Sequence, residues 1–269
     1  MWRWTLAYHH GWEETMDSFL VDSFVAGLAA SIACGMGALP LAFTWLHVER
    51  RVGLGYGLAG GLMFAASVYN LILPGLTIDN GTVGPVFQVI AGIFAGAGFL
   101  WAVNRGLTPE RVSRMRWFGS RQEILIFVAM CFHSIPEGVA VGVGYASAER
   151  IPEMESLGAT IAIAIAIHNI PEGLAVAIPL RANGASLARC FFTAFLTSLP
   201  QPLAAVPAAA LVWFFEPLMI PFLGFAAGAM IFLVLLELIP DALQRRTPLE
   251  IAWSFITGFS LMILAQVIL

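Results

Sequence analysis

The sequence predicts an all-α integral membrane protein with eight transmembrane helices. Apolar residues make up 59% of the chain and charged residues only 11%, and the mean hydropathy is +0.84. These values lie far outside the composition of a soluble globular domain. Apolar runs long enough to cross a hydrocarbon core of ~30 Å recur along the chain, each bounded by charged residues or by Pro and Gly.

Each apolar run is interpreted as a helix because it approaches the ~20 residues that a membrane-spanning helix needs. Gly and Ala are frequent within the runs, as expected where helix backbones pack closely in lipid. In chain order the runs are 19–45, 54–74, 83–103, 122–147, 157–180, 187–213, 217–239 and 249–269. We therefore divide the chain into an N-terminal extracytoplasmic tail, 1–18, and a single eight-helix transmembrane domain, 19–269.

The basic residues predict the orientation in the membrane. All 13 are arginine. With the N-terminus outside, the outer side carries only Arg3 and Arg150, and the loops on the inner side carry Arg50, Arg51, Arg105, Arg111, Arg114, Arg116, Arg121, Arg181, Arg189, Arg245 and Arg246. Because basic residues are enriched in cytoplasmic loops, this pattern predicts both termini outside and a multi-pass protein of the plasma (inner) membrane. The net charge of −4 does not favour a nucleic-acid partner.

Two short stretches inside apolar runs are nearly identical: residues 133–138 (HSIPEG) and 168–173 (HNIPEG). His and Glu are costly in a hydrocarbon environment, so their presence there indicates function. In each copy they are four residues apart and share one face of a helix. An ion-paired structural network is the alternative, but the repetition favours a divalent-metal site formed by His133, Glu137, His168 and Glu172.

The residue types of the motif fit a site through which a transition-metal ion is transported. Imidazole nitrogen and carboxylate oxygen suit zinc and other first-row divalent ions better than magnesium or calcium. Pro136 and Pro171 lack a backbone N–H, so each leaves a carbonyl of its helix without the usual donor. In lipid this is tolerated where the backbone faces protein or a water-filled path, which favours permeation over permanent binding.

The chain also shows an internal repeat. The segment 61–74 is echoed by 228–240 with a gap of one residue. In the predicted topology the two helices that carry these segments run in opposite directions, as do the two helices that carry the His-Glu motif. We therefore predict an inverted 3+2+3 repeat, an arrangement common in secondary transporters.

The two H-x-x-P-E-G motifs, together with segments 71–75 and 228–240, resemble the ZIP family of divalent metal transporters, most of all its compact prokaryotic members. The resemblance implies a secondary transporter that moves Zn²⁺, and also Fe²⁺, Mn²⁺, Co²⁺ or Cd²⁺, toward the cytoplasm. It further implies a metal centre, often binuclear, between the fourth and fifth helices, with the primary ligands His133, Glu137, His168 and Glu172. The metal is then the substrate, and no cofactor is expected.

The chain departs from the family pattern at the second metal position. Ser134 stands where the family usually has Asn, and Gln201 stands where the sixth helix usually has a Glu. Three neutral side chains, those of Ser134, Asn169 and Gln201, would therefore line this position. A second divalent ion would meet repulsion from the first with little compensation, so we predict one tightly bound ion per protomer and at most a weakly bound second ion.

Three more polar residues in or next to the apolar runs are candidates for the transport pathway. Glu237, near the inner end of the seventh helix, is predicted as an exit-path ligand, with an interfacial carboxylate as the alternative. Asp241 either belongs to the same path or is a solvated helix end. Asn70 forms either an interhelical hydrogen bond or an entrance-side ligand.

Two other functions stay open. An intramembrane zinc-dependent hydrolase would need an open water position on the metal and a general base, and the chain has no H-E-x-x-H motif. A metal-binding sensor or scaffold is the third possibility. We predict a transporter rather than an enzyme, with divalent metal ions and the lipid bilayer as partners, and we leave open whether it forms a homodimer.

Overall fold

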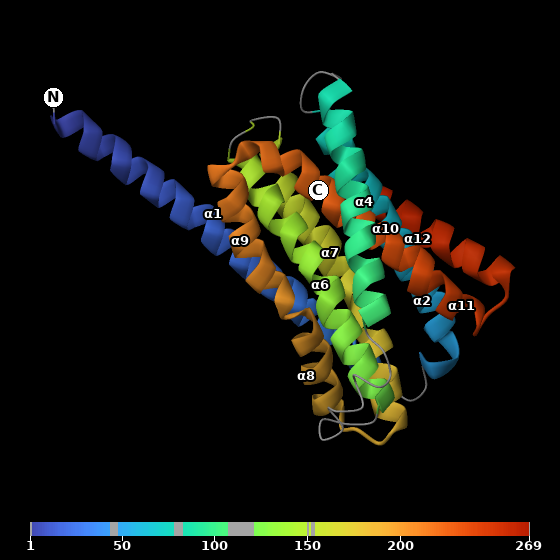
Figure 1. Cartoon of the computed structure of the whole chain (residues 1–269). Helices are drawn as coiled ribbons and strands as arrows, with labels where there is room; N and C mark the ends of the chain where they lie inside the picture. Colours follow the sequence, from blue (N-terminus) through green and yellow to red (C-terminus); the bar gives the residue numbers. More distant parts are fainter. Residues whose placement is uncertain are drawn as a thin grey trace.

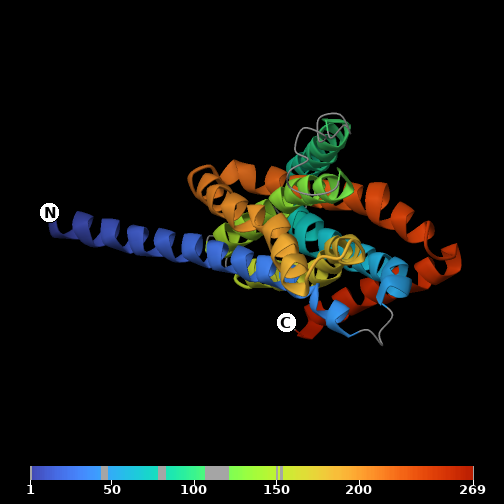
Figure 2. The ribbon, with the colours of Figure 1, turned by 90° about the horizontal axis from the view of Figure 1, so that it is seen from below.

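A computed structural model of the chain describes residues 2–43, 48–77, 83–106, 121–149, 151 and 154–268. Over these residues the chain is helical and contains no strand. The helices pack in one bundle, and the N-terminal part of the first helix extends away from it (Figures 1 and 2). Seven helical segments of the described residues are long and apolar enough to cross a membrane. The all-helical fold is therefore confirmed over the described residues, while the count of eight spans and the inverted repeat stay predictions.

Five helices overlap predicted runs, and the last three of them match their runs to within three residues at each end. They are α1 (Trp2–Met36), α2 (Val48–Ala66), α4 (Val83–Gly106), α7 (Leu157–Ala182) and α12 (Pro248–Ile268). The helix α1 already begins at Trp2, and its apolar part begins at Ser18, at the predicted end of the tail.

The predicted run 122–147 forms α6 (Arg121–Ala148), which is not among the seven candidate spans. Both α6 and α7 continue as helices through the prolines of their motifs, Pro136 and Pro171.

Two helices contain a wider, π-helical turn. The helix α2 passes through a π turn at Ser67–Ile72 into α3 (Leu73–Thr77). In the same way α10 (Met219–Leu233) passes through a π turn at Val234–Leu238 into α11 (Ile239–Leu243). A proline, Pro74 or Pro240, follows each turn closely, and because proline has no N–H the usual hydrogen bond is missing there. The π turns place Asn70 and Glu237 at matching points of two helices.

The predicted run 187–213 is two helices rather than one. The helix α8 (Leu187–Ser198) meets α9 (Pro200–Phe214) at Leu199. Pro200 cannot donate a backbone hydrogen bond, and the N–H of Leu199 bonds to the carbonyl of Leu196 at 3.3 Å, which tightens the last turn of α8. The pair α8 and α9 still counts as one candidate span, Leu187–Phe214.

Glycines let the main helix pairs approach closely. The helix α4 packs on α10, α2 on α12, α6 on α9 and α1 on α7. A Cβ atom added to Gly96 of α4 would lie 1.9 Å from the backbone oxygen of Phe225 in α10. One added to Gly61 of α2 would lie 2.0 Å from the backbone oxygen of Phe255 in α12. These contacts between backbones are typical of helix packing in membranes.

The helices that carry the two motifs lie in the middle of the bundle (Figure 1). The helix α6 contacts α7, α9 and α10, and α7 also contacts α1 and α2. Side chains on the facing sides of α6 and α7 are therefore enclosed by other helices.

Candidate metal site

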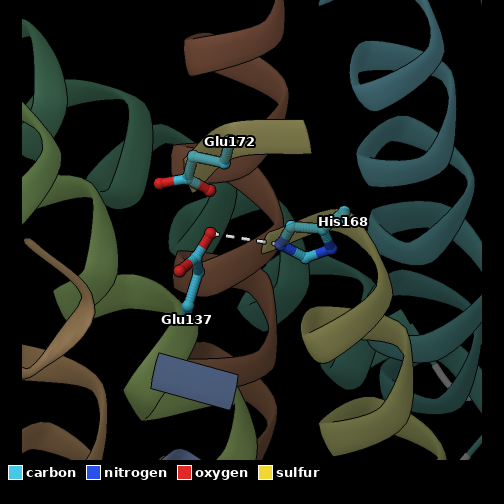
Figure 3. Close-up of side chains that lie close together, drawn as sticks. All are labelled: Glu137, His168 and Glu172. Atoms are coloured by element: carbon cyan, nitrogen blue, oxygen red, sulfur yellow. Dashed lines mark hydrogen bonds and ion pairs between the residues drawn. The ribbon is translucent and has the colours of Figure 1, made fainter. Parts of the chain in front are cut away.

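Three side chains of the repeated motif point toward one another between α6 and α7 (Figure 3). Glu137 comes from α6, and His168 and Glu172 come from α7. Their ligand atoms all lie within 4.8 Å of one another, and His168 Nε2 lies 3.2 Å from Glu137 Oε1. None of the three is more than 5% exposed. One imidazole and two carboxylates at this separation form a suitable ligand set for a divalent transition-metal ion.

The glycine after each Glu allows a neighbouring helix to pack closely beside this group. A Cβ atom on Gly138 would lie 2.3 Å from the backbone oxygen of Gln201 in α9. A Cβ atom on Gly173 would lie 1.7 Å from the backbone oxygen of Cys34 in α1. The motif therefore combines two metal-ligand residue types with the small residue that allows a neighbouring helix to pack directly beside them.

The electrostatics of the group favour a cation. Two buried carboxylates close together repel each other in a medium of low dielectric constant. Within the described part of the chain, Glu172 Oε2 and His168 Nδ1 are buried and have no hydrogen-bond partner. Buried polar atoms are almost always paired, so such exceptions point to a bound ion or a functional role. A divalent ion would both relieve the repulsion and provide a partner for Glu172.

The structure does not bring His133 into this group. His133 is 6% exposed and lies one turn before Glu137 on α6, with its Nε2 atom 3.7 Å from Glu237 Oε1. Asn104 of α4 donates a hydrogen bond to the same oxygen of Glu237 at 3.3 Å. His133 and Glu237 thus form a neighbouring polar pair, and a shared role of His133 with Glu137, His168 and Glu172 in metal binding stays a prediction.

The neutral residues predicted at the second metal position all hydrogen-bond within the protein. Ser134 Oγ lies 2.9 Å from the backbone oxygen of Thr197. Asn169 Nδ2 donates to Gln201 Oε1 at 3.2 Å, and Gln201 Nε2 donates to Glu137 Oε2. The side chains of Asn169 and Gln201 are fully buried. Gln201 therefore contacts a proposed ligand, Glu137, and Asn169 contacts Gln201. Their role at a second metal position stays a prediction.

The remaining predicted pathway residues differ in their surroundings. Asn70 is buried in the π turn after α2 and lines a small cavity. The other residues around this cavity are apolar: Ala66, Leu71, Ala140, Ile161, Ala164, Ile165 and Met230. Asp241 lies exposed on α11.

Sequence reasoning missed two residues around the group. Ser198 at the end of α8 lies with its Oγ atom 3.3 Å from Asn169 Nδ2, and its backbone oxygen accepts a hydrogen bond from Ser31 at 2.8 Å. Asn104, the partner of Glu237, falls one residue after a predicted run. Both residues are polar and lie within or at the end of an apolar run. Because polar side chains in lipid must find hydrogen-bond partners, this position was the signal that could have identified them.

The chain is similar to known zinc transporters over most of its length. The sequence model of the ZIP Zinc transporter family matches residues 110–266. The zinc transporter GufA of Myxococcus xanthus is 32% identical over 252 residues, which cover 88% of this chain and 96% of GufA. The zinc transporter ZIPB of Bordetella bronchiseptica is 32% identical over 246 residues, 88% of this chain and 78% of ZIPB.

A protein of Arabidopsis thaliana is 37% identical over 228 residues, 84% of this chain. The aligned part is only 35% of the plant protein, so this chain spans about a third of its length.

Proposed function

The chain belongs to the ZIP zinc transporter family, and on this premise we propose that it is a secondary transporter of divalent transition-metal ions, above all Zn²⁺, toward the cytoplasm. The observation that carries the proposal is the buried group of Glu137, His168 and Glu172 among helices able to cross a membrane. The relatives whose names state zinc transport support zinc as the main substrate.

The ligand set fits an ion that must be released again. Glu172 and Glu137 would neutralise the charge of the ion, and His168 would bind it with a neutral imidazole nitrogen. No thiolate belongs to the group, and thiolates would hold zinc more strongly. His133 and Glu237 would receive the ion next, because this pair lies one turn along α6 and Glu237 is partly exposed.

We also propose that the chain crosses the membrane eight times, in the inverted 3+2+3 repeat. The helix α6 would be the span that is added to the seven candidate segments. Two features support this repeat. First, the π turns that follow α2 and α10 match. Second, the repeat makes α2 equivalent to α10, α4 to α12 and α6 to α7. Under this equivalence the packed pair α4–α10 corresponds to the packed pair α12–α2. The pairs α6–α9 and α7–α1 correspond in the same way. The positive-inside pattern supports both termini outside and the plasma membrane as the location.

Flux measurements with the purified protein in proteoliposomes test the proposed function. We expect uptake of Zn²⁺, measured with and without a pH gradient and against a panel of Fe²⁺, Mn²⁺, Co²⁺, Cd²⁺ and Mg²⁺. The variant Glu172→Gln should lose uptake, and Glu155→Gln, at an exposed position between α6 and α7, should keep it. Equal flux in protein-free vesicles would refute the proposal.

The alternative activity, intramembrane hydrolysis, has no observation in its favour, and a peptide-hydrolysis assay on the same sample addresses it. The three ligands come from one chain, so the proposal needs no second copy. Whether the chain forms a homodimer is left open.

A further inference from the structure

Two buried amides link the carboxylate of Glu137 to the backbone of α1. Gln201 Nε2 of α9 donates to Glu137 Oε2. Gln201 Oε1 accepts from Asn169 Nδ2 at 3.2 Å, and Asn169 Nδ2 also donates to the backbone oxygen of Ala30 at 3.0 Å. Both amide side chains are fully buried, so water does not compete for these hydrogen bonds.

The ends of this chain of hydrogen bonds fix the direction of both amides. A backbone carbonyl can only accept, so Asn169 must turn its NH₂ group toward Ala30. The same NH₂ group faces Gln201, which must therefore present its oxygen to Asn169 and its NH₂ group to Glu137. An ionised carboxylate also only accepts, so flipped amides would set oxygen against oxygen at both ends.

The two oxygens of Glu137 consequently have different partners. Oε2 accepts the N–H of Gln201, whereas Oε1 lies 3.2 Å from His168 Nε2 and faces the group that includes Glu172. Glu137 can thus offer one oxygen to an ion while its other oxygen is already bound. A charge-assisted hydrogen bond of this kind is stronger than one between neutral groups and holds the carboxylate in place.

We propose that Gln201, held by Asn169, is a positioning residue that restricts Glu137 to coordination through one oxygen and excludes a second cation from Oε2. The proposal rests on the metal-binding function proposed above for Glu137, His168 and Glu172. The N–H of Gln201 carries a partial positive charge and stands where a second ion would contact the carboxylate. The group therefore takes one divalent ion per chain.

Replacement of the amide by an isosteric carboxylate should reverse this effect. In the variant Gln201→Glu the donor that faces Glu137 Oε2 becomes an acceptor of nearly the same size. Two neighbouring carboxylates then repel each other unless a cation lies between them. The variant Gln201→Met keeps the approximate volume but removes the donor, so it leaves Glu137 free to rotate without adding charge.

The stoichiometry of binding to the full chain in detergent micelles tests the proposal. Equilibrium dialysis gives bound Zn²⁺, and the double variant His168→Ala/Glu172→Gln gives the background from other positions. Electron paramagnetic resonance of bound Mn²⁺ shows whether two ions share a bridging carboxylate, because such a pair is exchange-coupled. We expect one ion above background and an uncoupled spectrum in the wild type, and two ions and a coupled spectrum in Gln201→Glu.

Gln201→Met should still bind one ion, with an affinity lower by about 10- to 100-fold, as is usual when a residue that orients a metal ligand is removed. Two ions in the wild type, one ion in folded Gln201→Glu, or an unchanged affinity in Gln201→Met would overturn the proposal. Equal binding by the wild type and the double variant would instead refute the metal-binding function itself.

Discussion

His133 Nε2 lies 3.7 Å from Glu237 Oε1, whereas His168 Nε2 lies 3.2 Å from Glu137 Oε1. The two histidines of the repeated motif therefore face different carboxylates. The side chain of Glu237 is 30% exposed, but those of Glu137 and His168 are at most 1% exposed. The residues of the two motifs thus take part in a buried group and, through His133 and Glu237, in a neighbouring pair with one more exposed carboxylate, which suits an ion that moves from one to the other.

The variant His133→Ala should retain metal binding at the buried group. We expect its Zn²⁺ affinity to fall by less than ~10-fold, and that of His168→Ala to fall by more than ~100-fold, because His168 belongs to the buried group and His133 lies beside Glu237 instead. Calorimetric titration of both variants measures the difference. Flux through His133→Ala should nevertheless be slower, because the next position on the path is weakened. Equal losses of affinity would return His133 to the primary site.

The variant Glu172→Gln should separate transport from stability. The substitution removes one of two neighbouring buried carboxylates and keeps the size of the side chain. We expect metal flux to fall by more than ~100-fold, while the metal-free protein unfolds at the same or a higher temperature because repulsion is removed. Flux in proteoliposomes and thermal unfolding in detergent measure the two effects. A large loss of stability would mean that Glu172 is structural.

Metal binding should weaken as the pH falls. A protonated His168 has no lone pair for the ion on that nitrogen, and protonated carboxylates lose their charge, so protons compete with the metal. Each proton that the ion must displace lowers the apparent Zn²⁺ affinity by up to ~10-fold for every unit by which the pH falls. Zn²⁺ affinity measured from mildly alkaline to mildly acidic pH checks this. A flat profile would argue that His168 is not a ligand.

The fold was predictable from the sequence to the extent that it depends on local composition. The runs 83–103 and 157–180 correspond to α4 and α7, because the length of an apolar run directly limits where a helix can cross lipid. The division of 187–213 into α8 and α9 was missed, although Pro200 was visible in the sequence. A proline can lie inside a continuous helix, as Pro136 does in α6, so its presence alone does not locate a break.

The candidate site was predictable within one helix and less so between helices. The spacing of four residues correctly put His168 and Glu172 on one face of α7. The same spacing put His133 and Glu137 on one face of α6, but it could not show that the π turn after α10 brings Glu237 to His133. The rotation of neighbouring helices is set by packing, and glycine contacts such as that of Gly138 with α9 are not evident from spacing.

Gly173 of α7 packs directly on the backbone of α1. A Cβ atom at Gly173 would lie 1.7 Å from the oxygen and 2.6 Å from the carbonyl carbon of Cys34. Both atoms belong to a helix backbone, which cannot move aside as a flexible side chain can. Because Glu172 precedes Gly173, any shift of α7 away from α1 also displaces a proposed ligand.

The variant Gly173→Ala should therefore destabilise the protein and weaken metal binding together. We expect a loss of about 1–3 kcal/mol in unfolding free energy, the usual effect of overpacking a tight contact. The control is Gly98→Ala in α4, where an added Cβ atom meets nothing within 4 Å. There the higher helix propensity of Ala should leave stability unchanged or raise it by up to ~1 kcal/mol. Tryptophan fluorescence during thermal unfolding in detergent compares the two variants. If Gly173→Ala behaved like Gly98→Ala and bound zinc normally, α1 could not pack on α7 as closely as the structure requires.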